Sequence, residues 1–344
     1  TYHPGHTITP KVTKNNKVLS KLKINDGIKL SIIIPCYNEE EVLPLTLEKL
    51  KTLSNEWSSR DDCKSIEFLF VDDGSQDRTA ELLAEAANAY QQFKVIHFSR
   101  NFGHQAALTA GYEFVKGDVI VSLDADLQDP PDLIITMLEK LKEGFDIIYA
   151  ARKSRDTDSR FKRKTADFFY WMMKKLGVDI IHNHADFRMI TRRVLNAFLK
   201  FNENNLFIRA TFPMVGFPSS IVYYDRPERK AGKTKYSFHK MLEFAIDGLT
   251  SFSVVPLRIC SMLGLLVSLL ALLMLFWSIV VKIIGGAIPG WTSIVAPLYL
   301  LGGVQLLFLG IVGEYIGKIY SEVKNRPRYI IQETINFDED NVPG

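Results

Sequence analysis

The sequence predicts an α/β protein with a Rossmann-like, mostly parallel sheet, followed by a C-terminal transmembrane hairpin of two helices. Two observations lead to this fold class. From Leu30 onward, short β-branched runs alternate with longer helical segments, and this alternation is typical of a parallel sheet covered by helices. Near the C-terminus, two long apolar stretches carry no charge. Because 47% of the 344 residues are hydrophobic, the chain can bury enough apolar surface to fold, which excludes intrinsic disorder.

Four strands and four helices are predicted along the first half of the chain. Each strand is a continuous apolar run, as expected when both faces of a strand are buried. Each helix is a longer segment with apolar residues at helical spacing. In order, the predicted elements are strand 30–35, helix 40–53, strand 66–71, helix 79–90, strand 94–98, helix 105–115, strand 118–123 and helix 132–143.

The hairpin is predicted from two spans, 258–281 and 292–317, which are uncharged except near their ends. At about 1.5 Å per residue, each is long enough to cross a hydrocarbon core of about 30 Å. Glycine and proline residues at 285–290 indicate a turn, and Trp291 stands where an interfacial aromatic is expected. A buried core helix is the alternative, but such helices rarely stay apolar on every face.

The charge pattern then predicts the topology and the domain organisation. Cations gather on both sides of the hairpin and only Lys282 lies in its loop, so the positive-inside rule places both termini of an integral membrane protein in the cytosol. Basic amphipathic patterns at 161–176 and 238–252 predict either membrane-surface helices or ordinary helices that pack on their own domain. The predicted segments are a basic flexible leader 1–29 without a signal peptide, an α/β domain 30–225, a basic loop and amphipathic juxtamembrane helix 226–257, the hairpin 258–317 and a cytosolic tail 318–344.

Composition and motif content exclude several classes of function. The chain has 42 Lys and Arg residues and 39 Asp and Glu residues, which leaves a net charge of +3. This positive charge is too small for a protein that binds mainly to nucleic-acid backbones. Cys36, Cys63 and Cys260 form neither a disulfide framework nor a zinc pattern. No G-x-G-x-x-G follows a predicted strand, so the dinucleotide-binding fingerprint is absent.

Acidic residues follow three of the predicted strands. Glu39 follows the first strand, Asp72 and Asp73 follow the second, and the fourth runs into D-A-D-L-Q-D-P-P from Asp124. Ligands of open α/β sheets bind beyond the carboxyl ends of the strands. Loop acids commonly serve as turn or capping groups, so each motif alone leaves that role open, whereas three acidic ends on one sheet indicate a ligand site.

Asp124, Asp126 and Gln128 are candidate ligands of a divalent cation. If the chain stays extended here, these alternate side chains share one face. Carboxylate and amide oxygens suit Mg²⁺ or Mn²⁺, which usually keep waters and substrate phosphates as further ligands. Asp129 precedes two prolines, so we interpret it as a helix N-cap with proline in the first turn.

Four motifs occur in order along the α/β domain: S-I-I-I-P-C-Y-N-E-E (31–40), V-D-D-G-S-Q-D-R-T (71–79), S-R-N-F-G-H-Q-A-A-L-T-A-G (99–111) and L-D-A-D-L-Q-D-P-P (123–131). Together they resemble family 2 glycosyltransferases of the polyprenyl-phosphate type: dolichyl-phosphate mannose synthases and, more closely, bacterial bactoprenol glucosyltransferases. D-F-R-M-I (186–190), E-R-K-A-G-K-T-K-Y (228–236) and G-E-Y-I-G-K-I-Y (313–320) also match. The resemblance covers roughly 30–328.

This resemblance implies a GT-A fold and inverting transfer of one hexose from a nucleotide-sugar, with UDP-glucose favoured, to an undecaprenyl phosphate. The reaction would occur at the cytosolic face of a bacterial inner membrane. The resemblance also implies a nucleotide site of Pro35, Tyr37, Glu39, Asp72, Asp73, Gln105 and Asp124, a Mg²⁺ or Mn²⁺ site of Asp124, Asp126 and Gln128, and an acceptor-phosphate site of Arg152, Arg163, Arg229 and Lys235. Asp186 and Asp126 are the implied catalytic residues.

The role of Asp186 stays open at this point. The resemblance makes it a candidate base, but a phosphate monoester has its second pKa near 6 and is largely ionised at neutral pH without one. Asp186 would then orient the sugar hydroxyls or Arg188. For Arg163, binding of a lipid headgroup is the alternative to a substrate contact.

Three other functions are weighed against this one. A GDP-mannose-using enzyme shares the fold and the acceptor class. A processive polysaccharide synthase shares the nucleotide domain, but the sequence has no Q-x-x-R-W and too few spans for a polymer channel. A non-catalytic membrane scaffold would not need the acidic strand ends. Gly313 and Gly317 form G-x-x-x-G, which favours close helix contact within the hairpin or in a homo-oligomer.

Overall fold

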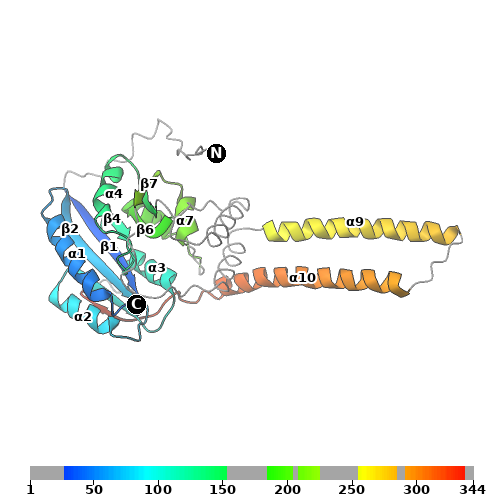
Figure 1. The fold of residues 1–344 in the computed structure, drawn as a ribbon, viewed down its shortest axis with the longest axis horizontal. Coiled ribbons are helices and arrows are strands. Elements are labelled where there is room, and N and C mark those ends of the chain that lie inside the picture. The colour runs from blue at the N-terminus through cyan, green and yellow to red at the C-terminus, as the bar shows by residue number, and fades with distance from the viewer. Residues whose placement is uncertain (1–26, 153–183, 204–207, 225–254, 285–290, 338–344) are drawn as a thin grey trace. The chain divides into compact units, whose positions relative to one another are not determined.

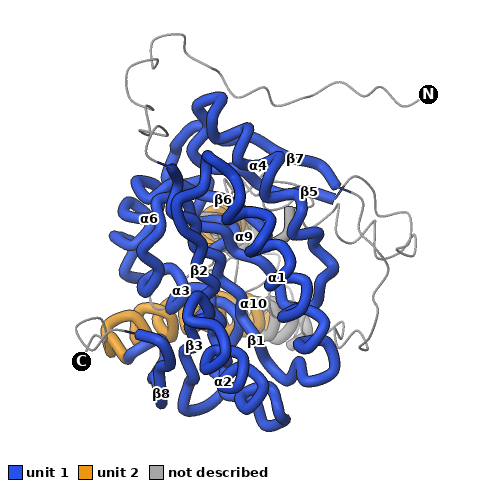
Figure 2. The backbone as a smooth tube through the Cα atoms, turned by 90° about the vertical axis from the view of Figure 1, so that its left-hand side faces the viewer, with its two compact units in different colours: residues 1–170, 179–235, 327–344 blue, residues 171–178, 236–326 orange. Residues whose placement is uncertain are grey.

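The computed structural model describes residues 27–152, 184–203, 208–224, 255–284 and 291–337 (Figure 1). The chain divides into two compact units, and each is described by itself (Figure 2). The first holds the described residues up to 224 together with 327–337, and the second holds the two long C-terminal helices. The predicted leader and the amphipathic segments 161–176 and 238–252 lie outside the described residues.

The first unit is built on an eight-stranded mixed sheet. Its strands are β1 (Ile28–Cys36), β2 (Cys63–Asp72), β3 (Phe93–Phe98), β4 (Val119–Ser122), β5 (Ile147–Arg152), β6 (His184–Thr191), β7 (Ser219–Tyr224) and β8 (Ile331–Ile335), in the spatial order β7-β5-β6-β4-β1-β2-β3-β8. The neighbours β4, β1, β2 and β3 are parallel, which confirms the predicted parallel core. By contrast, β6 runs antiparallel between β4 and β5, and β8 is antiparallel to β3.

Helices cover both faces of this sheet. They are α1 (Leu43–Ser58), α2 (Thr79–Ala89), α3 (His104–Phe114), α4 (Leu133–Lys142), α6 (Arg192–Phe198) and α7 (Ile208–Val215). The buried side chains of α1, α2 and α4 form one core with one face of the sheet, and those of α3, α6 and α7 form a second core with the other face. The four predicted strands and four predicted helices all occur, with ends within a few residues of those expected.

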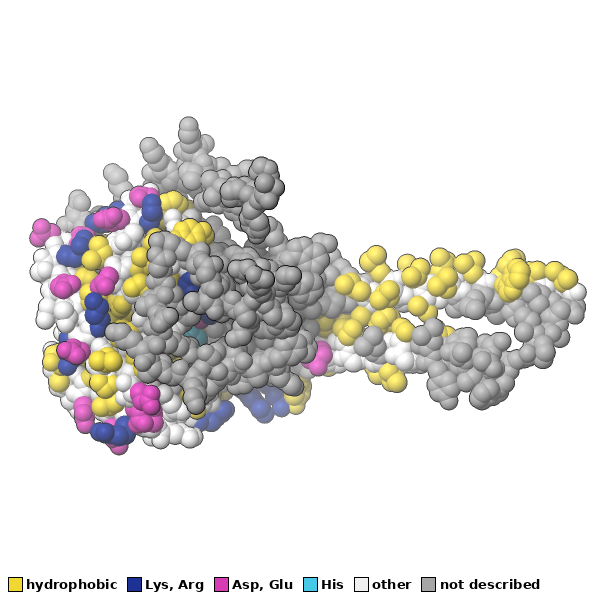
Figure 3. Space-filling view, viewed as in Figure 1, with side chains coloured by type: hydrophobic (Ala, Val, Ile, Leu, Met, Phe, Trp, Pro, Cys, Tyr) yellow, Lys and Arg dark blue, Asp and Glu magenta, His cyan; other side chains and the backbone are white. Residues whose placement is uncertain are grey.

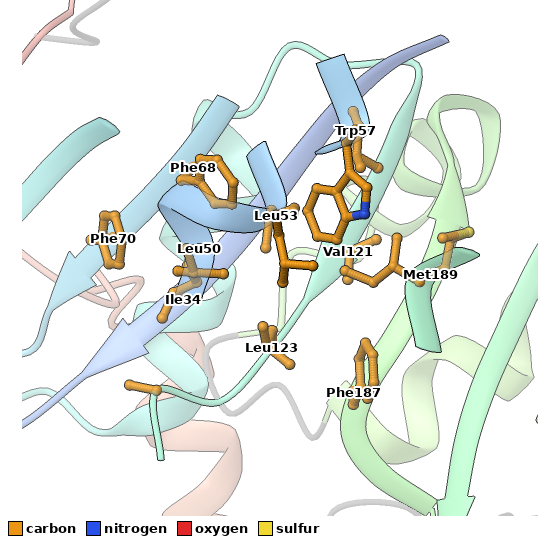
Figure 4. Close-up of a cluster of buried hydrophobic side chains, with 14 of the residues drawn as sticks. Ile34, Leu50, Leu53, Trp57, Phe68, Phe70, Val121, Leu123, Phe187 and Met189 are labelled. Atoms are coloured by element: carbon orange, nitrogen blue, oxygen red, sulfur yellow. The ribbon is translucent and has the colours of Figure 1, made fainter. Parts of the chain in front are cut away.

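Both cores form because the strands are apolar on both faces, so alternate side chains pack against the helices on either side of the sheet. In β1, Ile32 and Ile34 face the first core whereas Ile33 faces the second, and all three are fully buried. In the first core, Trp57 of α1 stacks with Phe68 of β2 at a ring separation of 6.4 Å (Figure 4). Burial of such a side chain stabilises the fold by about 1.5–3 kcal/mol. The rigid layers hold the loops at the strand ends in fixed positions.

The C-terminal segment returns to this sheet as an edge strand. The sequence analysis assigned residues 318–344 to a tail, and the structure assigns 331–335 to β8, paired with β3. Asn336 Nδ2 donates to the carbonyl oxygens of Ala87 at 2.7 Å and Phe93 at 2.8 Å. The Tyr329 hydroxyl donates to Glu113 on α3. The chain that leaves the second unit is therefore fastened to the first by specific hydrogen bonds.

The second unit consists of α9 (Val255–Ile283) and α10 (Trp291–Val323), which lie side by side in Figure 1. Apolar side chains cover much of their described surface (Figure 3), including Leu265, Phe276, Leu306 and Leu309, which are all more than half exposed. Over the part of the chain that the structure describes, one segment, Leu301–Val323, has the length and apolar composition of a membrane span. Both predicted spans thus lie within helices, and one of the two helices contains a candidate membrane span.

The G-x-x-x-G glycines are not the point where α9 and α10 come closest. A Cβ added at Gly264 would lie 3.8 Å from the Phe308 ring, whereas none added at Gly313 or Gly317 would meet a described atom within 4 Å. Within the described part of the hairpin, Gly313 and Gly317 therefore make no close interhelical contact.

Candidate active site

The candidate site residues gather at one edge of the sheet. The parallel strands β1, β2 and β4 end there, and so does β5, which pairs in parallel with β7. Because β6 is antiparallel to both β4 and β5, its beginning lies at this same edge, and Asp186 is its third residue. The sheet topology thus brings residues far apart in the sequence to one place, as expected for open α/β sheets.

Hydrogen bonds join the loops that follow β1 and β2. The amide of Asn38 donates to Ser75 Oγ at 2.9 Å, and the amide of Gln76 donates to Asn38 Oδ1 at 2.8 Å. The amide of Glu39 donates to Thr79 Oγ1 at 2.8 Å. Asn38 adopts a positive φ of 53°, a conformation that asparagine tolerates well. These contacts give the acidic loops a defined shape before any ligand binds.

Asp72 is buried at the end of β2 and bonded within the protein. Its Oδ2 lies 3.2 Å from Nδ1 of His97 on β3, and its Oδ1 accepts hydrogen bonds from the Ser75 amide and hydroxyl. A buried carboxylate of this kind is costly unless it is paired. Asp72 therefore has a structural role at the site, whether or not it also binds nucleotide.

Asp73 links the loop after β2 to the start of α3. Its carboxylate accepts hydrogen bonds from the amides of Phe102 at 2.7 Å and Gly103 at 2.9 Å. Gly103 has φ +100°, a conformation that favours glycine. Burial raises the pKa of Asp73 even though these two amides act in the opposite direction. The carboxylate already binds the amides of the loop before α3, so its predicted nucleotide contact would have to be made alongside these hydrogen bonds.

The segment Asp124–Gln128 is a turn and not an extended strand. This corrects the expectation that alternate side chains share one face here because the chain is extended. β4 ends at Ser122, and Leu127 adopts φ +54°. The Gln128 amide donates to Asp126 Oδ1 at 3.1 Å, a local bond that closes the turn. Such side-chain to backbone bonds are the usual way in which aspartate stabilises a turn.

The donor atoms of this turn fit a divalent cation. Among the described residues, the buried Gln128 Oε1 accepts no hydrogen bond. Partial burial and the charges of Asp186, Asp129 and Asp126 raise the pKa of Asp124 to about 6, although His104 opposes this shift. Described His, Cys, Asp and Glu side chains form no group of three or more suited to a metal ion. A cation bound here would therefore be coordinated by two carboxylates and one amide oxygen of the protein together with the phosphates of the ligand.

Asp129 binds Tyr224, which corrects its interpretation as a helix N-cap. Helix α4 begins at Leu133 with Asp132 at the N-cap position. Asp129 is buried and its Oδ1 accepts a hydrogen bond from the Tyr224 hydroxyl at the end of β7. Arg152 Nε lies 3.5 Å from the same hydroxyl. The two prolines shift the helix start, and Asp129 instead joins the acidic loop to β5 and β7.

Asp186 lies at the centre of the ionic cluster at this edge. Its side chain is 5% exposed, and Arg188 Nη2 donates to its Oδ1 at 2.8 Å. Arg209 on α7 donates to both carboxylate oxygens, at 3.0 and 2.8 Å. His104 Nε2 lies 3.3 Å from Asp186 Oδ2 and 3.9 Å from Asp124 Oδ1. Burial favours the neutral acid, but Arg209, His104 and Arg188 together hold the pKa of Asp186 well below its usual value.

The remaining predicted site residues differ in their solvent exposure. Tyr37 is exposed, Glu39 is half-buried and Pro35 is buried at the end of β1. Gln105 Oε1 accepts a hydrogen bond from the Ile208 amide at 3.1 Å, so it holds the start of α7. Arg152 ends β5 at the same edge. The other three residues predicted to bind the acceptor phosphate, Arg163, Arg229 and Lys235, lie outside the described residues.

Sequence reasoning missed four residues of this site: His97, His104, Arg209 and Tyr224. His104 stands inside the N-F-G-H-Q stretch, and its position in the motif between a strand and the following helix was a usable signal. Arg209 and Tyr224 belong to α7 and β7, which no quoted motif covers. Their roles depend on contacts across the sheet that spacing along the chain does not reveal.

Comparison with known proteins identifies the family to which the chain belongs. Residues 31–199 match the family described as Glycosyl transferase family 2, and residues 255–319 match the GtrB C-terminal hairpin. A Bacillus subtilis glycosyltransferase, YkcC, is 42% identical over 90% of this chain and 95% of its own length. The SfII prophage-derived bactoprenol glucosyl transferase of Shigella flexneri is 38% identical over 89% of this chain and 98% of its own length.

Among solved structures, a Mycobacterium tuberculosis glucosyl-3-phosphoglycerate synthase with Mn²⁺, UDP and glucosyl-3-phosphoglycerate aligns with a TM-score of 0.44. Its identity is 16%, and the alignment covers 66% of this chain and 80% of that one. The identity to YkcC and to the Shigella enzyme over nearly their whole length, together with the matched domain, settles the assignment. The chain belongs to glycosyltransferase family 2, with a GT-A α/β domain and a GtrB-type C-terminal segment.

Proposed function

We propose that this glycosyltransferase transfers a single glucose from UDP-glucose to undecaprenyl phosphate at the cytosolic face of the bacterial inner membrane. The observation that carries the proposal is the meeting of opposite charges at one sheet edge. The acidic turn at Asp124 adjoins the cationic cluster around Asp186 through His104. A reaction between a nucleotide diphosphate donor and a phosphate acceptor needs both kinds of site within reach of one sugar. The Shigella relative is named a bactoprenol glucosyl transferase, which supports glucose as the transferred sugar and a bactoprenol lipid as the acceptor.

On the donor side, Asp124, Asp126 and Gln128 would hold Mg²⁺ or Mn²⁺ on the diphosphate. The bound cation would stabilise the charge that develops on the leaving nucleoside diphosphate. The exposed Tyr37 and the half-buried Glu39 are available to contact the uridine, with Pro35, Asp72, Asp73 and Gln105 shaping the loops around it. This division fits the observed hydrogen bonds, because Asp72 already contacts His97 on β3, Asp73 bonds the loop before α3, and Gln105 bonds the first residue of α7.

On the acceptor side, an oxygen of the lipid phosphate would attack the anomeric carbon while the bond to the UDP oxygen breaks. The electron pair of that bond leaves with UDP, and the new linkage has inverted configuration. The attacking phosphate is largely a dianion at neutral pH, so no proton has to be removed. Arg152, with Arg163, Arg229 and Lys235, is proposed to bind this phosphate, because an arginine fork bonds two oxygens at once.

For the second unit we propose that both α9 and α10 cross the membrane as a hairpin with cytosolic ends. The exposed apolar side chains of both helices would be unfavourable in water, and the cations flanking the hairpin follow the positive-inside rule. The hairpin would anchor the enzyme beside its lipid acceptor. Gly313 and Gly317 would then be available for helix contact between subunits of a homo-oligomer.

The direct test uses the full-length protein in detergent or nanodiscs with undecaprenyl phosphate and a panel of radiolabelled nucleotide-sugars. We expect label from UDP-glucose to enter the organic phase, and we expect EDTA to stop the transfer. Preference for GDP-mannose would identify the mannose-transferring alternative instead. Binding of nucleotide-sugar without any transfer would favour the scaffold alternative and contradict the proposal.

A further inference from the structure

Thr46 is a buried threonine of α1 whose hydroxyl bonds a segment outside its own helix. Threonine inside a helix commonly donates its hydroxyl hydrogen to the carbonyl oxygen four residues earlier. For Thr46 that oxygen belongs to Val42 and lies 3.2 Å from Oγ1, whereas the carbonyl oxygen of Ala125 lies at 2.7 Å. A hydroxyl has one proton to donate, and the shorter distance assigns it to Ala125. The residue is 0% exposed, so this hydrogen bond is shielded from water.

Ala125 stands between the two carboxylates proposed to hold the cation, Asp124 and Asp126. Its carbonyl oxygen belongs to the peptide unit that joins Ala125 to Asp126, and such a unit is planar. A hydrogen bond to that oxygen therefore fixes the orientation of the peptide that leads into Asp126. Ala125 is 4% exposed, and a buried carbonyl oxygen that loses its donor is costly. Removal of the Thr46 hydroxyl would therefore release the backbone between the two carboxylates.

The Thr46 hydroxyl is itself held in place by the loop that precedes α1. The amides of Val42 and Leu43 donate to the carbonyl oxygen of Glu39, at 3.1 and 2.9 Å. The Glu39 amide in turn donates to Thr79 Oγ1 at the start of α2. Thr46 follows one turn later in α1. One side chain thus connects the acidic turn to the helix start that is fixed to the loop proposed to contact the uridine.

A fixed backbone is important at this turn because its carboxylates repel each other. Asp124 and Asp126 are separated by a single residue, and their like charges favour conformations that move them apart before a cation binds. The Gln128 amide closes the far side of the turn by donating to Asp126 Oδ1 at 3.1 Å. The Thr46 bond holds the middle of the turn.

We propose that Thr46 is a positioning residue for the divalent cation: its hydroxyl holds the Ala125 carbonyl so that Asp124 and Asp126 are presented to the cation together. This inference rests on the proposed function and deepens it by adding a residue that acts through the acidic turn. Groups that orient the ligands of a metal contribute strongly to its binding, and their loss weakens metal affinity about tenfold to a hundredfold.

The test measures binding of Mn²⁺ to the full-length enzyme in detergent with saturating UDP. The EPR signal of the free ion reports the binding, so the readout needs no transfer. The variants are T46V, which replaces the hydroxyl with a methyl group of similar size, T46S, which keeps the hydroxyl, and D124N, which removes a proposed ligand. The matched control is T109V. Thr109 is also buried, at 2% exposure, but its hydroxyl donates to the carbonyl oxygen of Gln105 within its own helix, at 2.8 Å.

We expect T46V to raise the Kd for Mn²⁺ about tenfold or more, while T46S stays within about threefold and T109V within about twofold of the wild type. In transfer assays, T46V should need about tenfold more Mn²⁺ for its half-maximal rate. Its kcat should approach the wild-type value at saturating Mn²⁺, because the residue acts on cation binding and not on the chemical step. A merely structural loss would lower kcat without changing the Mn²⁺ requirement.

Two results would overturn the inference. One is a T46V enzyme, folded by its thermal melt, whose Kd for Mn²⁺ is unchanged while D124N abolishes the binding. The other is a T46S enzyme as impaired as T46V, which would show that packing around residue 46, and not its hydroxyl, determines the affinity. If T46V fails to fold, T46A decides by the same comparison. Wild-type Mn²⁺ binding that D124N leaves unchanged would instead refute the metal site of the proposed function, and this inference with it.

Discussion

The hydroxyl of Tyr224, the last residue of β7, donates a hydrogen bond to the buried carboxylate of Asp129, which follows the acidic turn after β4. Two segments almost a hundred residues apart are thereby joined at the candidate site. Arg152 Nε lies 3.5 Å from the same hydroxyl, so Tyr224 stands between the proposed donor and acceptor sites. Loss of this hydroxyl should affect both stability and transfer.

Tyr224→Phe should lower the free energy of unfolding by about 1–3 kcal/mol, because it removes the hydrogen bond that the Tyr224 hydroxyl donates to the buried carboxylate of Asp129. Thermal unfolding should then show a Tm lower by several degrees, and the rate of glucose transfer should fall. The neighbouring Tyr223 is 58% exposed, so Tyr223→Phe is the matched control and should change neither quantity. Equal behaviour of the two variants would show that the Asp129 contact contributes nothing.

Asp124→Asn should abolish transfer and yet stabilise the metal-free protein above pH 6. The folded-state pKa of Asp124 is raised to about 6 by partial burial and neighbouring carboxylates. A carboxyl with a raised pKa contributes stability below its unfolded-state value near 4, and this contribution is lost as the pH rises through 6. With EDTA, the Tm of the wild type should therefore fall relative to that of Asp124→Asn between pH 5 and pH 7.

Addition of Mn²⁺ should reverse this difference by raising the Tm of the wild type but not that of Asp124→Asn. Asp61→Asn at an exposed position is the control and should follow the wild type throughout. Equal metal-induced shifts in wild type and Asp124→Asn would contradict the metal assignment without reference to activity.

Asn336→Ala should destabilise the α/β unit although residue 336 follows α10 of the second unit in the sequence. The Asn336 amide bonds the carbonyls of Ala87 and Phe93, and its loss should cost about 1–2 kcal/mol. Thermal unfolding followed by tryptophan fluorescence would report this through the buried Trp57. The exposed Gln332 on β8 provides the control variant Gln332→Ala. No difference between the two variants would mean that the hydrogen bonds of Asn336 contribute nothing to the stability of the α/β unit.

The sequence predicted the parallel core because β1 to β4 are continuous apolar runs with helices between them. It did not predict β6, whose His184–Thr191 stretch contains buried charged residues such as Asp186 and Arg188. Nor did it predict β8, a five-residue strand that pairs with β3 and packs Ile331 and Ile335 against the two cores. Pairing between segments so far apart in the sequence forms only in the assembled sheet. The hydrophobic periodicity of a segment does not predict which distant strand it will pair with.

The sequence predicted where on the sheet the candidate site lies, but not how its residues contact one another. Acidic residues after buried strands correctly indicated the edge where Asp72 and Asp124 lie. The assumption of an extended chain after β4 was wrong, because Leu127 takes a left-handed conformation that turns the segment. The partners of Asp129 and Asp186, namely Tyr224 and Arg209, come from β7 and α7 and meet them only in the folded protein.

The chemical structure of the lipid product is the sharpest test of the proposed transfer of one glucose to undecaprenyl phosphate. Wild-type enzyme, UDP-glucose and undecaprenyl phosphate should be incubated to completion, and the extracted lipid analysed by mass spectrometry and NMR. We expect one glucose per lipid phosphate, joined through a β-linked phosphodiester, with one UDP released for each lipid consumed. A lipid that carries a chain of several sugars, or an α-linked glucose, would contradict this expectation.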